Sequence, residues 1–484
     1  MDTVRWLPWG ADAFARARAE EMPVLLSISA TWSASCRDMD RTTYADPVVA
    51  GIVNERFVPI RVDADRRPDI SERYGLGGWP TTAFLTAEGE LIGGGTYVAR
   101  DRMPSVLERV AEAFRSRRGD WTAANPRAEV RQPDESTDSP NLAELVFDAF
   151  DATHGGFGHE PKFPLTAPLE LALEIYRETR DAAMARVVEA TLDAVGWGGL
   201  YDEGDGGFFR YAARRDWRQP HREKLLDVNA SLLRMYVEAS DTLRIARYRE
   251  RAGDVLRYVQ TWLADPVDGG WAGSQHADRD YYAAALEQRR AGTPPTVDGV
   301  VYAGWNALMV SATLRAAELF DDTPLGEFAL KSLERVVLAC YSPGLGMAHC
   351  LDDRPSVRGL LDDQILMAAA HLDAHAVTGN IVYEMMAQEL VHYAVRTMWD
   401  DERGGFFDRS VPEDTERVGF MRDRLKPFVG NCEAARVLKR LAATKGDHTF
   451  GQHAEATLAA MAPLAAQQGP LAAHYLLALR QPIG

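Results

Sequence analysis

Residues 23–36 read Pro-Val-Leu-Leu-Ser-Ile-Ser-Ala-Thr-Trp-Ser-Ala-Ser-Cys, and this stretch decides the fold of the first part of the chain. The apolar run from Pro23 to Ala30 is typical of a strand that is buried on both faces. The turn that follows ends at Cys36, and we expect a helix from about Arg37 to Asn54. A buried strand, a tight turn and a helix in this order predict an α/β domain.

The flanking sequence completes this domain over residues 1–117. We expect helices at 9–20, 68–74 and 103–115, and strands at 57–62, 82–85 and 90–93, the last two joined by a turn at 87–89. The resulting order β-α-β-α-β-β-α is that of the thioredoxin fold. Pro80 follows Trp79 just before the hairpin, where this fold places a cis-proline against its redox turn.

The redox turn itself is degenerate. In C-x-x-C motifs the first cysteine is the exposed nucleophile and the second resolves the mixed disulfide. Here Ser33 occupies the first position and Cys36 the second. Because a serine hydroxyl is a poor thiol-exchange nucleophile at neutral pH, we expect no dithiol oxidoreductase activity. Cys36 is then either a packed apolar side chain or a monothiol site for glutathionylation or partner capture.

Composition limits the classes of function. The formal net charge of −17 and a pI near 5.2 argue against a nucleic-acid partner, which needs a basic face. No apolar run approaches the roughly 20 residues that span a bilayer, and the segment 1–8 lacks the layout of a secretory signal, so we expect no membrane association and a cytoplasmic location. The four cysteines are irregularly spaced, and we predict no metal and no cofactor. The chain has only six lysines, which reflects either codon bias toward arginine or an acidic surface adapted to high salt.

A linker and a long helical region follow. Residues 118–140 are polar and contain proline, as is typical of a linker. From residue 141 to 484 the apolar periodicity is helical, with about a dozen helices and almost no strand signal. The expected helices are 142–149, 165–178, 180–196, 226–239, 247–264, 304–320, 325–340, 360–377, 382–398, 430–443 and 452–466.

An acidic turn followed by Gly-Gly-aromatic punctuates these helices. It recurs at Asp151–Phe157, Asp202–Phe208, Asp265–Trp271 and Asp400–Phe406, with a weaker copy at Tyr341–Met347. Helix pairs that cannot bury their apolar faces alone must stack or close on themselves. We therefore expect an all-α (α/α)6 toroid whose loops gather around one mouth; an open solenoid is the alternative.

Several short motifs together resemble the spermatogenesis-associated protein 20 family. They are Trp6–Trp9, Phe84–Thr86, Gly93–Tyr97, Gly155–Gly158, Pro161–Pro164, Pro220–Lys224, Trp305-Asn306, Asp362-Asp363 and Gly430-Asn431. The resemblance implies a thioredoxin-like domain fused to a six-hairpin-glycosidase-like barrel, a fold shared with sugar 2-epimerases and glycosidases. The chain departs from the family at C-H-W-C-H, which reads Ser33 to Arg37. It also departs at H-x-D-D-K, of which only Asp298 is kept.

Candidate chemistry lies in the barrel. His221, Glu223 and Lys224 form the densest ionisable cluster, and His221 with Glu223 or Asp227 could act as an acid–base pair. Lys162 and Lys224 use a compact ammonium where the chain otherwise favours arginine. The alternative to a catalytic pocket is a buried ion-pair network that clamps the loops.

Other residues are weaker candidates. Asp362 and Asp363 begin a predicted helix, so one could cap it while Asp363 faces the mouth as a carboxylate for glycoside chemistry. His371 and His375 share a helix face but lack a third metal ligand. Sugar-stacking or core-packing roles are open for a further set: Trp305, Asn306, Phe157, Phe208, Trp271 and Phe406.

Two functional hypotheses follow. In the first, the barrel binds or modifies a small-molecule sugar with His221, Glu223, Lys224 and Asp363, while the thioredoxin-like domain is structural. In the second, the protein is a redox-linked scaffold whose surface near Cys36 and Pro80 binds a protein partner without turnover.

Overall fold

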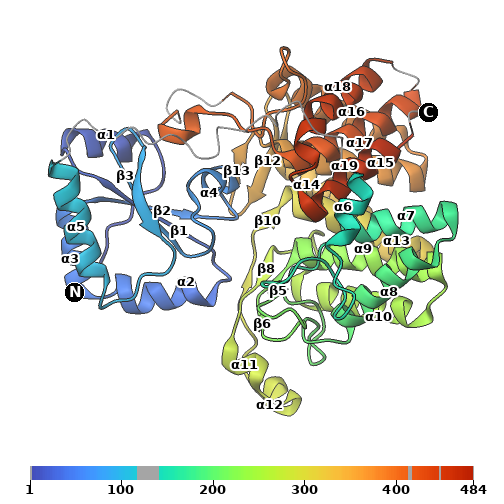
Figure 1. Ribbon diagram of the computed structural model, residues 1–484, viewed down its shortest axis with the longest axis horizontal. Coiled ribbons are helices and arrows are strands. Elements are labelled where there is room, and N and C mark those ends of the chain that lie inside the picture. The colour runs from blue at the N-terminus through green and yellow to red at the C-terminus, as the bar shows by residue number, and fades with distance from the viewer. Residues whose placement is uncertain (1–2, 117–140, 412–416, 446–447, 483–484) are drawn as a thin grey trace. The chain divides into compact units, whose positions relative to one another are not determined.

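The computed structural model describes residues 3–116, 141–411, 417–445 and 448–482, and the chain divides into two compact units (Figure 1). The first unit comprises residues 1–131 and 411–425, and the second comprises residues 132–410 and 426–484. The sequence analysis assigned all of 141–484 to the helical domain. The structure instead places residues 411–425 in the first unit. Among the described residues, no helix combines the length and the apolar character needed to cross a membrane.

The first unit has the thioredoxin-like fold that the sequence predicts. Its mixed sheet has the order β2-β1-β3-β4, in which β1 runs parallel to β2 and antiparallel to β3. The strands are β1 (Val24–Ser29), β2 (Val58–Asp63), β3 (Thr81–Leu85) and β4 (Leu91–Gly95). The helices are α1 (Ala11–Ala19), α2 (Ala34–Met39), α3 (Pro47–Arg56), α4 (Pro68–Tyr74) and α5 (Met103–Ser116). The Trp79–Pro80 peptide bond is cis, as expected.

Strand β1 is buried on both faces because its side chains alternate between two apolar clusters. Leu26 and Ile28 pack with Phe14 on one face, and Leu25 packs with Phe57 on the other. The single helix predicted for 37–54 is broken into α2, a π-helical turn at Asp40–Tyr44, and α3. The break has a local cause: Pro47 has no N–H to continue a helix, and the Asp46 carboxylate caps a new one by accepting from Val48 N and Val49 N.

Residues 418–423, which we call the core insert, complete the first unit from far along the chain. Val418, Phe420 and Met421 are buried in the same cluster as Phe14 and Leu26. Phe420 stacks on Tyr74 with ring centroids 5.1 Å apart, and the Tyr74 hydroxyl accepts from Phe420 N at 2.8 Å.

Two further contacts fix the backbone of the core insert. The Arg73 guanidinium donates to the carbonyl oxygens of Phe420 and Asp423 at 3.1 and 2.6 Å. Gly89 and Gly419 pack backbone against backbone: a Cβ on Gly89 would lie 2.9 Å from Gly419 Cα. The core insert is therefore part of the unit's core.

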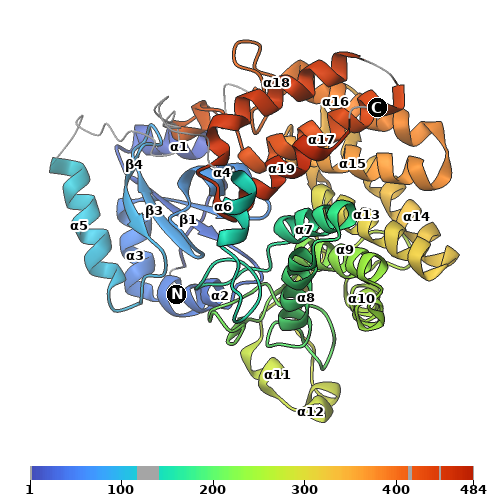
Figure 2. The same cartoon turned by 45° about the vertical axis from the view of Figure 1, so that its right-hand side comes forward.

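The second unit is a closed toroid of helix pairs (Figure 2). Each inner helix contacts the next, and the last contacts the first, so the ring closes and the open-solenoid alternative fails. The inner helices are α7 (Ala167–Thr179), α9 (Leu226–Leu243), α13 (Ala303–Phe320), α15 (Leu361–Thr378), α17 (Phe428–Lys445) and α19 (Ala472–Arg480). Their partners are α8 (Ala182–Gly196), α10 (Ala246–Tyr258), α14 (Thr323–Cys340), α16 (Ile381–Met398), α18 (His448–Ala465) and α6 (Leu142–Asp148), which packs on α19.

Short strands lie between these helix pairs. The sequence analysis did not predict these strands. They are β5 (Tyr211–Ala212), β6 (Pro220–His221), β7 (Lys224–Leu225), β8 (Ser274–Gln275), β9 (Val297–Asp298), β10 (Val301–Tyr302), β11 (Tyr341–Ser342), β12 (Gly346–Leu351) and β13 (Pro355–Arg358). Two small helices, α11 (Arg279–Ala283) and α12 (Leu286–Ala291), lie between β8 and β9. Most of these strands have two residues, which is too short for a period-2 pattern.

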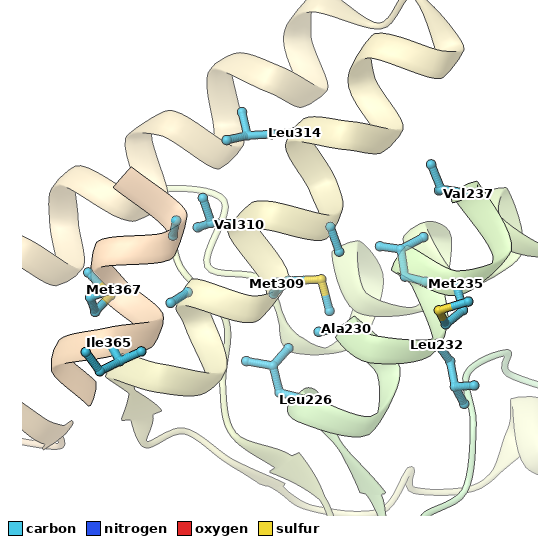
Figure 3. Close-up of a cluster of buried hydrophobic side chains, with 14 of the residues drawn as sticks. Leu226, Ala230, Leu232, Met235, Val237, Met309, Val310, Leu314, Ile365 and Met367 are labelled. Carbon is cyan, nitrogen blue, oxygen red and sulfur yellow. The ribbon is translucent and has the colours of Figure 1, made fainter. Parts of the chain in front are cut away.

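The main apolar core lies within the toroid. Buried side chains from α9, α13 and α15, such as Leu226, Met309 and Ile365, belong to one continuous cluster (Figure 3). This packing holds neighbouring inner helices together and so fixes the positions of their first turns.

The core insert generates a prediction. Phe420→Ala should lower the free energy of unfolding of the first unit by about 3–5 kcal/mol, because it removes a buried ring from a packed cluster. Hydrogen exchange of β1 and β2 measures this loss, and Val411→Ala at an exposed position is the control. Unchanged protection of both strands in Phe420→Ala would contradict the role given to the core insert.

Candidate functional site

Each of the four Gly-Gly-aromatic turns is held by an ion pair, which is buried in the first two turns and partly exposed in the other two. One carboxylate oxygen of the turn's aspartate accepts backbone N–H groups of its own turn, and the other contacts a cation. The pairs are Asp151–Lys162 at 2.8 Å, Asp202–Lys224 at 2.8 Å, Asp265–Arg335 at 3.0 Å and Asp400–Lys426 at 2.6 Å. In the last three turns the same cation donates to the carbonyl oxygen of the first glycine of the Gly-Gly pair. We call this arrangement, in which a turn is held by its aspartate and the paired cation, a clamp; the sequence repeats it four times.

An amide side chain completes three of the four clamps; in the first turn the Thr191 hydroxyl accepts from Gly156 N instead. Asn229 accepts from Phe208 N, Asn306 from Trp271 N and Asn431 from Phe406 N, at 2.6–2.8 Å. Each asparagine also donates to the carbonyl of that aromatic residue and to the residue four positions before itself. Gln364 does the same for Met347 in the weaker copy. All four amides are the fourth residue of an inner helix, so each amide joins a turn to a helix start.

The clamps correct four of the predicted site residues. Lys162, Lys224 and Asn306 are fully buried, with their polar groups bound to the turns, so we no longer propose that they contact a substrate. Burial lowers the pKa of Lys224 to about 8, but its Nζ lies among the rings of Phe209, Tyr258 and Tyr282 rather than at a surface. Phe208 is also fully buried and stacks on Tyr236.

The other turn aromatics pack in the same way. Phe157, Trp271 and Phe406 are at most 2% exposed. Of the two roles left open for them, core packing therefore applies and sugar stacking does not. Trp305 is half-buried against Tyr302, with ring centroids 4.6 Å apart.

The predicted catalytic cluster is dispersed. His221 is exposed and stacks on Tyr211 at 4.2 Å, whereas Glu223 is buried near Arg210 at 3.5 Å. Asp363 is buried and accepts from His349 Nδ1 at 3.0 Å and from Gly304 N at 3.2 Å. It does not cap its helix, and its partners are His349 and Gly304, whereas His221 and Glu223 share the charge of Arg210.

The two histidines of α15 do not form a metal site. His371 is buried with Nδ1 2.7 Å from Met367 O, and burial lowers its pKa to about 4. His375 instead lies 3.5 Å from Glu384. Within the described ranges, no group of three metal-ligating side chains comes together.

A recess of about 390 Å³ lies at the N-terminal ends of α7, α9 and α19. Its lining combines apolar and polar side chains: Phe163, Pro164, Leu165, Thr166, Ala167, Pro168, Arg210, Leu225, Asp227, Val228, Ser231, Leu471 and His474. Its volume falls within the ~300–1,000 Å³ of small-molecule sites. Of the predicted site residues, only Asp227 lines it.

Asp227 has the features of a reactive carboxyl. It is the second residue of α9, and its Oδ1 is buried without a hydrogen-bond partner among the residues that the structure describes. Burial raises the pKa of Asp227 above that of an ordinary aspartate. A carboxyl with one unpartnered oxygen and a raised pKa can hold a proton and offer it to a ligand in the recess.

His474 lines the same recess and is oriented by a carboxylate. Its Nδ1 lies 2.8 Å from Glu433 Oε1, which favours the tautomer with the proton on Nδ1 and leaves Nε2 basic. Glu433 in turn contacts Arg436, which binds Glu170 at 2.5 Å. Although burial opposes it, Arg436 and His474 hold the pKa of Glu433 at about 2.

Asp362 is the second residue of α15, the position that Asp227 has in α9. It is exposed, yet desolvation by the surrounding protein and the charge of Asp363 raise its pKa to about 6. Gly430 makes room for it, since a Cβ there would lie 2.7 Å from Asp362 Oδ1.

Sequence reasoning missed His474 and Glu433. His474 lies on α19, a helix that was not predicted, and Glu433 follows Asn431 in a motif that was singled out only for resemblance. The only sequence signal for His474 was a histidine inside the apolar C-terminal run.

In the first unit the redox turn is closed. Ser33 caps α2 by accepting from Cys36 N at 3.4 Å, and both side chains are buried. Burial raises the pKa of Cys36, whose Sγ accepts from Ala30 N. Cys36 is therefore a packed thiol, with Pro80 buried in the following segment.

Comparisons with known proteins agree with this architecture. Residues 1–130 match a family described as "Protein of unknown function, DUF255", a thioredoxin-like family. The chain is 29% identical to human spermatogenesis-associated protein 20 over 57% of its own length and 39% of the human protein. It is 28% identical to an uncharacterised Caenorhabditis elegans protein over 57% and 41%. The predicted resemblance is confirmed, and the chain spans about two fifths of the length of these relatives.

Solved structures share the fold of the toroid. A D-mannose isomerase has a TM-score of 0.54 at 14% identity, and a cellobiose 2-epimerase from Bacillus thermoamylovorans has 0.53 at 11%. Both alignments cover 65% of this chain and 82% of the other. A GH76 α-mannanase from Bacteroides thetaiotaomicron has 0.51 at 10%, over 71% and 97%. At these identities the comparison establishes the fold alone.

The clamps generate a second prediction. Lys224→Met should lower the free energy of unfolding of the second unit by about 3 kcal/mol, since removing one partner of a buried pair costs about 3–5 kcal/mol. We expect the lower end because Arg289 still contacts Asp202 at 2.7 Å. Urea unfolding measures the loss, and Arg186→Met, at an exposed cation on α8, is the control. Equal stability of the two variants would contradict the clamp.

The redox turn generates a third prediction. With dithiothreitol, the chain should reduce insulin no faster than background, because it lacks a nucleophile at residue 33. Ser33→Cys should raise the rate, since it restores C-x-x-C at a helix N-terminus. Ser35→Cys is the matched control, as it adds an exposed thiol at the wrong spacing. Robust reduction by the unchanged chain would contradict this view of the turn.

Proposed function

We propose that the helical unit binds a neutral sugar in the recess and modifies it by acid–base proton transfer. The observation that carries the proposal is the Asp227 carboxyl, whose Oδ1 has no hydrogen-bond partner among the described residues, in a recess shared with the Glu433-oriented His474. One group can hold a proton and the other can accept one, which is the pairing that acid–base catalysis needs.

The remaining lining suits a sugar. Phe163 is 38% exposed and offers an apolar ring, while Arg210 and Ser231 supply hydrogen-bond donors. Phe163 stacks on Tyr211 with ring centroids 4.5 Å apart. His221 stacks on the same Tyr211 ring, with centroids 4.2 Å apart. His221 thus supports the lining from outside the recess.

The helix ends add an electrostatic contribution. Three helices begin at the recess, and their first turns carry partial positive charge. Negative charge that develops on a sugar oxygen during proton removal is stabilised in such a field. The toroid fold also occurs in a sugar 2-epimerase, a D-mannose isomerase and an α-mannanase, and this likeness favours a sugar as the substrate.

The roles are then specific. His474 Nε2 removes a proton from the sugar, and Glu433 stabilises the imidazolium that forms. Asp227 donates a proton to the oxygen or carbon that becomes electron-rich. In a hydrolytic variant of the same chemistry, Asp227 protonates the leaving oxygen and His474 activates water.

The test is a panel of mono- and disaccharides incubated with the full chain in D2O. Proton NMR should show deuterium incorporation next to a carbonyl carbon, or a reducing-sugar assay should show bond cleavage. Asp227→Asn and His474→Gln should each reduce turnover by about 10²–10⁴-fold, the usual contribution of a general acid or base. Glu250→Gln, at an exposed carboxylate on α10, should leave turnover unchanged.

The pH profile separates the roles. Asp227 acts in its protonated form, so turnover should fall as the pH rises through its raised pKa. Asp227→Asn should remove this limb of the profile. Absence of both deuterium incorporation and bond cleavage across the whole panel would overturn the proposed function.

A further inference from the structure

A second hollow of about 440 Å³ lies in the helical unit at the turn between β5 and β6. Three of its seven lining residues are arginines, namely Arg214, Arg215 and Arg218. The chain as a whole carries a formal charge of −17, so a hollow with this composition is unusual for it. None of these arginines belongs to the recess at Asp227.

The turn that carries the arginines is anchored by a buried side chain. Trp217 is 1% exposed, and its Nε1 donates to His154 O at 2.9 Å, which anchors the turn to a clamped Gly-Gly loop. Trp217 and Gln219 have φ values of 64° and 56°, in the left-handed region that non-glycine residues rarely adopt. Such backbone persists only where its surroundings impose it, and it is concentrated at functional sites.

One arginine is fixed in advance. The Arg215 guanidinium binds both oxygens of Asp151 at 2.7 and 2.9 Å, and Lys162 neutralises the same carboxylate. Because Lys162 balances the charge of Asp151, the lining of the hollow has three arginines against two carboxylates, those of Glu160 and Asp216. The net charge of the hollow is therefore positive.

The carboxylate of Glu160 lies in the hollow, where it accepts from the groups that could bind another anion. Glu160 Oε1 accepts the backbone N–H of Arg215 at 3.0 Å, and Oε2 lies 3.6 Å from Arg214 Nη1. Both side chains of this second contact are about half exposed, so their attraction is weak. Arg218 is 80% exposed, and Asp216 contacts it at 3.2 Å.

We propose that this hollow binds a phosphate group, with Glu160 as a displaceable internal anion. A phosphate brings more charge and more acceptor oxygens than a carboxylate, and arginine forks match its geometry. The Arg215 N–H and the Arg214 and Arg218 guanidinium groups bind the phosphate after Glu160 turns away. The source is either free inorganic phosphate or the phosphate ester of a small molecule.

The experiment is isothermal titration of the full chain with inorganic phosphate and with glucose 6-phosphate, at constant ionic strength set by sodium chloride. We expect binding of at least one of them. Binding of both at equal affinity assigns free phosphate, and tighter binding of the ester assigns a phosphorylated small molecule. No heat with either ligand above a chloride control overturns the proposal.

Variants locate the binding. Arg214→Gln with Arg218→Gln should weaken binding by about tenfold or more, as expected for lost charge-assisted hydrogen bonds. Arg257→Gln, at a 73% exposed arginine on α10, is the matched control and should change nothing. Glu160→Gln should tighten binding several-fold because it removes the competing charge. Equal weakening by Arg257→Gln, or weaker binding by Glu160→Gln, would overturn the proposal.

Because all the changed side chains are exposed, thermal unfolding should be unaffected and folding failure is separable from lost binding. The recess is tested independently, since Asp227→Asn should leave phosphate binding unchanged. Failure of the sugar panel therefore says nothing against the phosphate hollow, and the reverse also holds.

Discussion

The toroid depends on an aspartate–cation pair at each of four turns, fully buried in two of them and partly exposed in the others. A carboxylate taken out of water costs several kcal/mol unless a cation and hydrogen-bond donors replace the solvent, and each clamp supplies both. Asp202 illustrates this: its own turn, Lys224 and Arg289 satisfy its oxygens. The lysine also binds the carbonyl of Gly206, whose φ of 81° lets the turn reverse tightly. The charged pair thereby fixes the turn that leads into each helix pair.

This constraint also creates the site. Because an amide at the fourth residue of an inner helix grips the preceding turn, the first turns of α9, α13, α15 and α17 share one local geometry. The second residue of each helix then has an equivalent place. In α9 and α15 that residue is an aspartate, and both carboxyls have a raised pKa. The clamps are thus structural, while the residues between them are free to carry chemistry.

The sequence was sufficient for the architecture and only partly for the site. The four Gly-Gly-aromatic turns predicted the closed ring, because a repeated turn imposes a repeated helix pair. The same repeats misdirected the chemistry, since a rare lysine inside a motif fits a buried clamp as well as a catalytic ammonium. Lys224 is the clearest case. Asp227 was identified from its neighbours in sequence, but His474 was not, because only the closure of the ring brings α19 to α7.

The first unit shows the same limit in another form. No local pattern marks residues 418–423 as part of its core, since their partners Arg73 and Tyr74 lie about 350 residues earlier. In its redox turn, Ser33 caps a helix and Cys36 fills a buried space. A capping hydroxyl stabilises the helix N-terminus by satisfying a backbone donor, whereas a thiolate there would be stabilised for reaction instead. The position that would hold a nucleophile has become part of the scaffold. The proposed chemistry of this chain therefore rests on the recess of the helical unit.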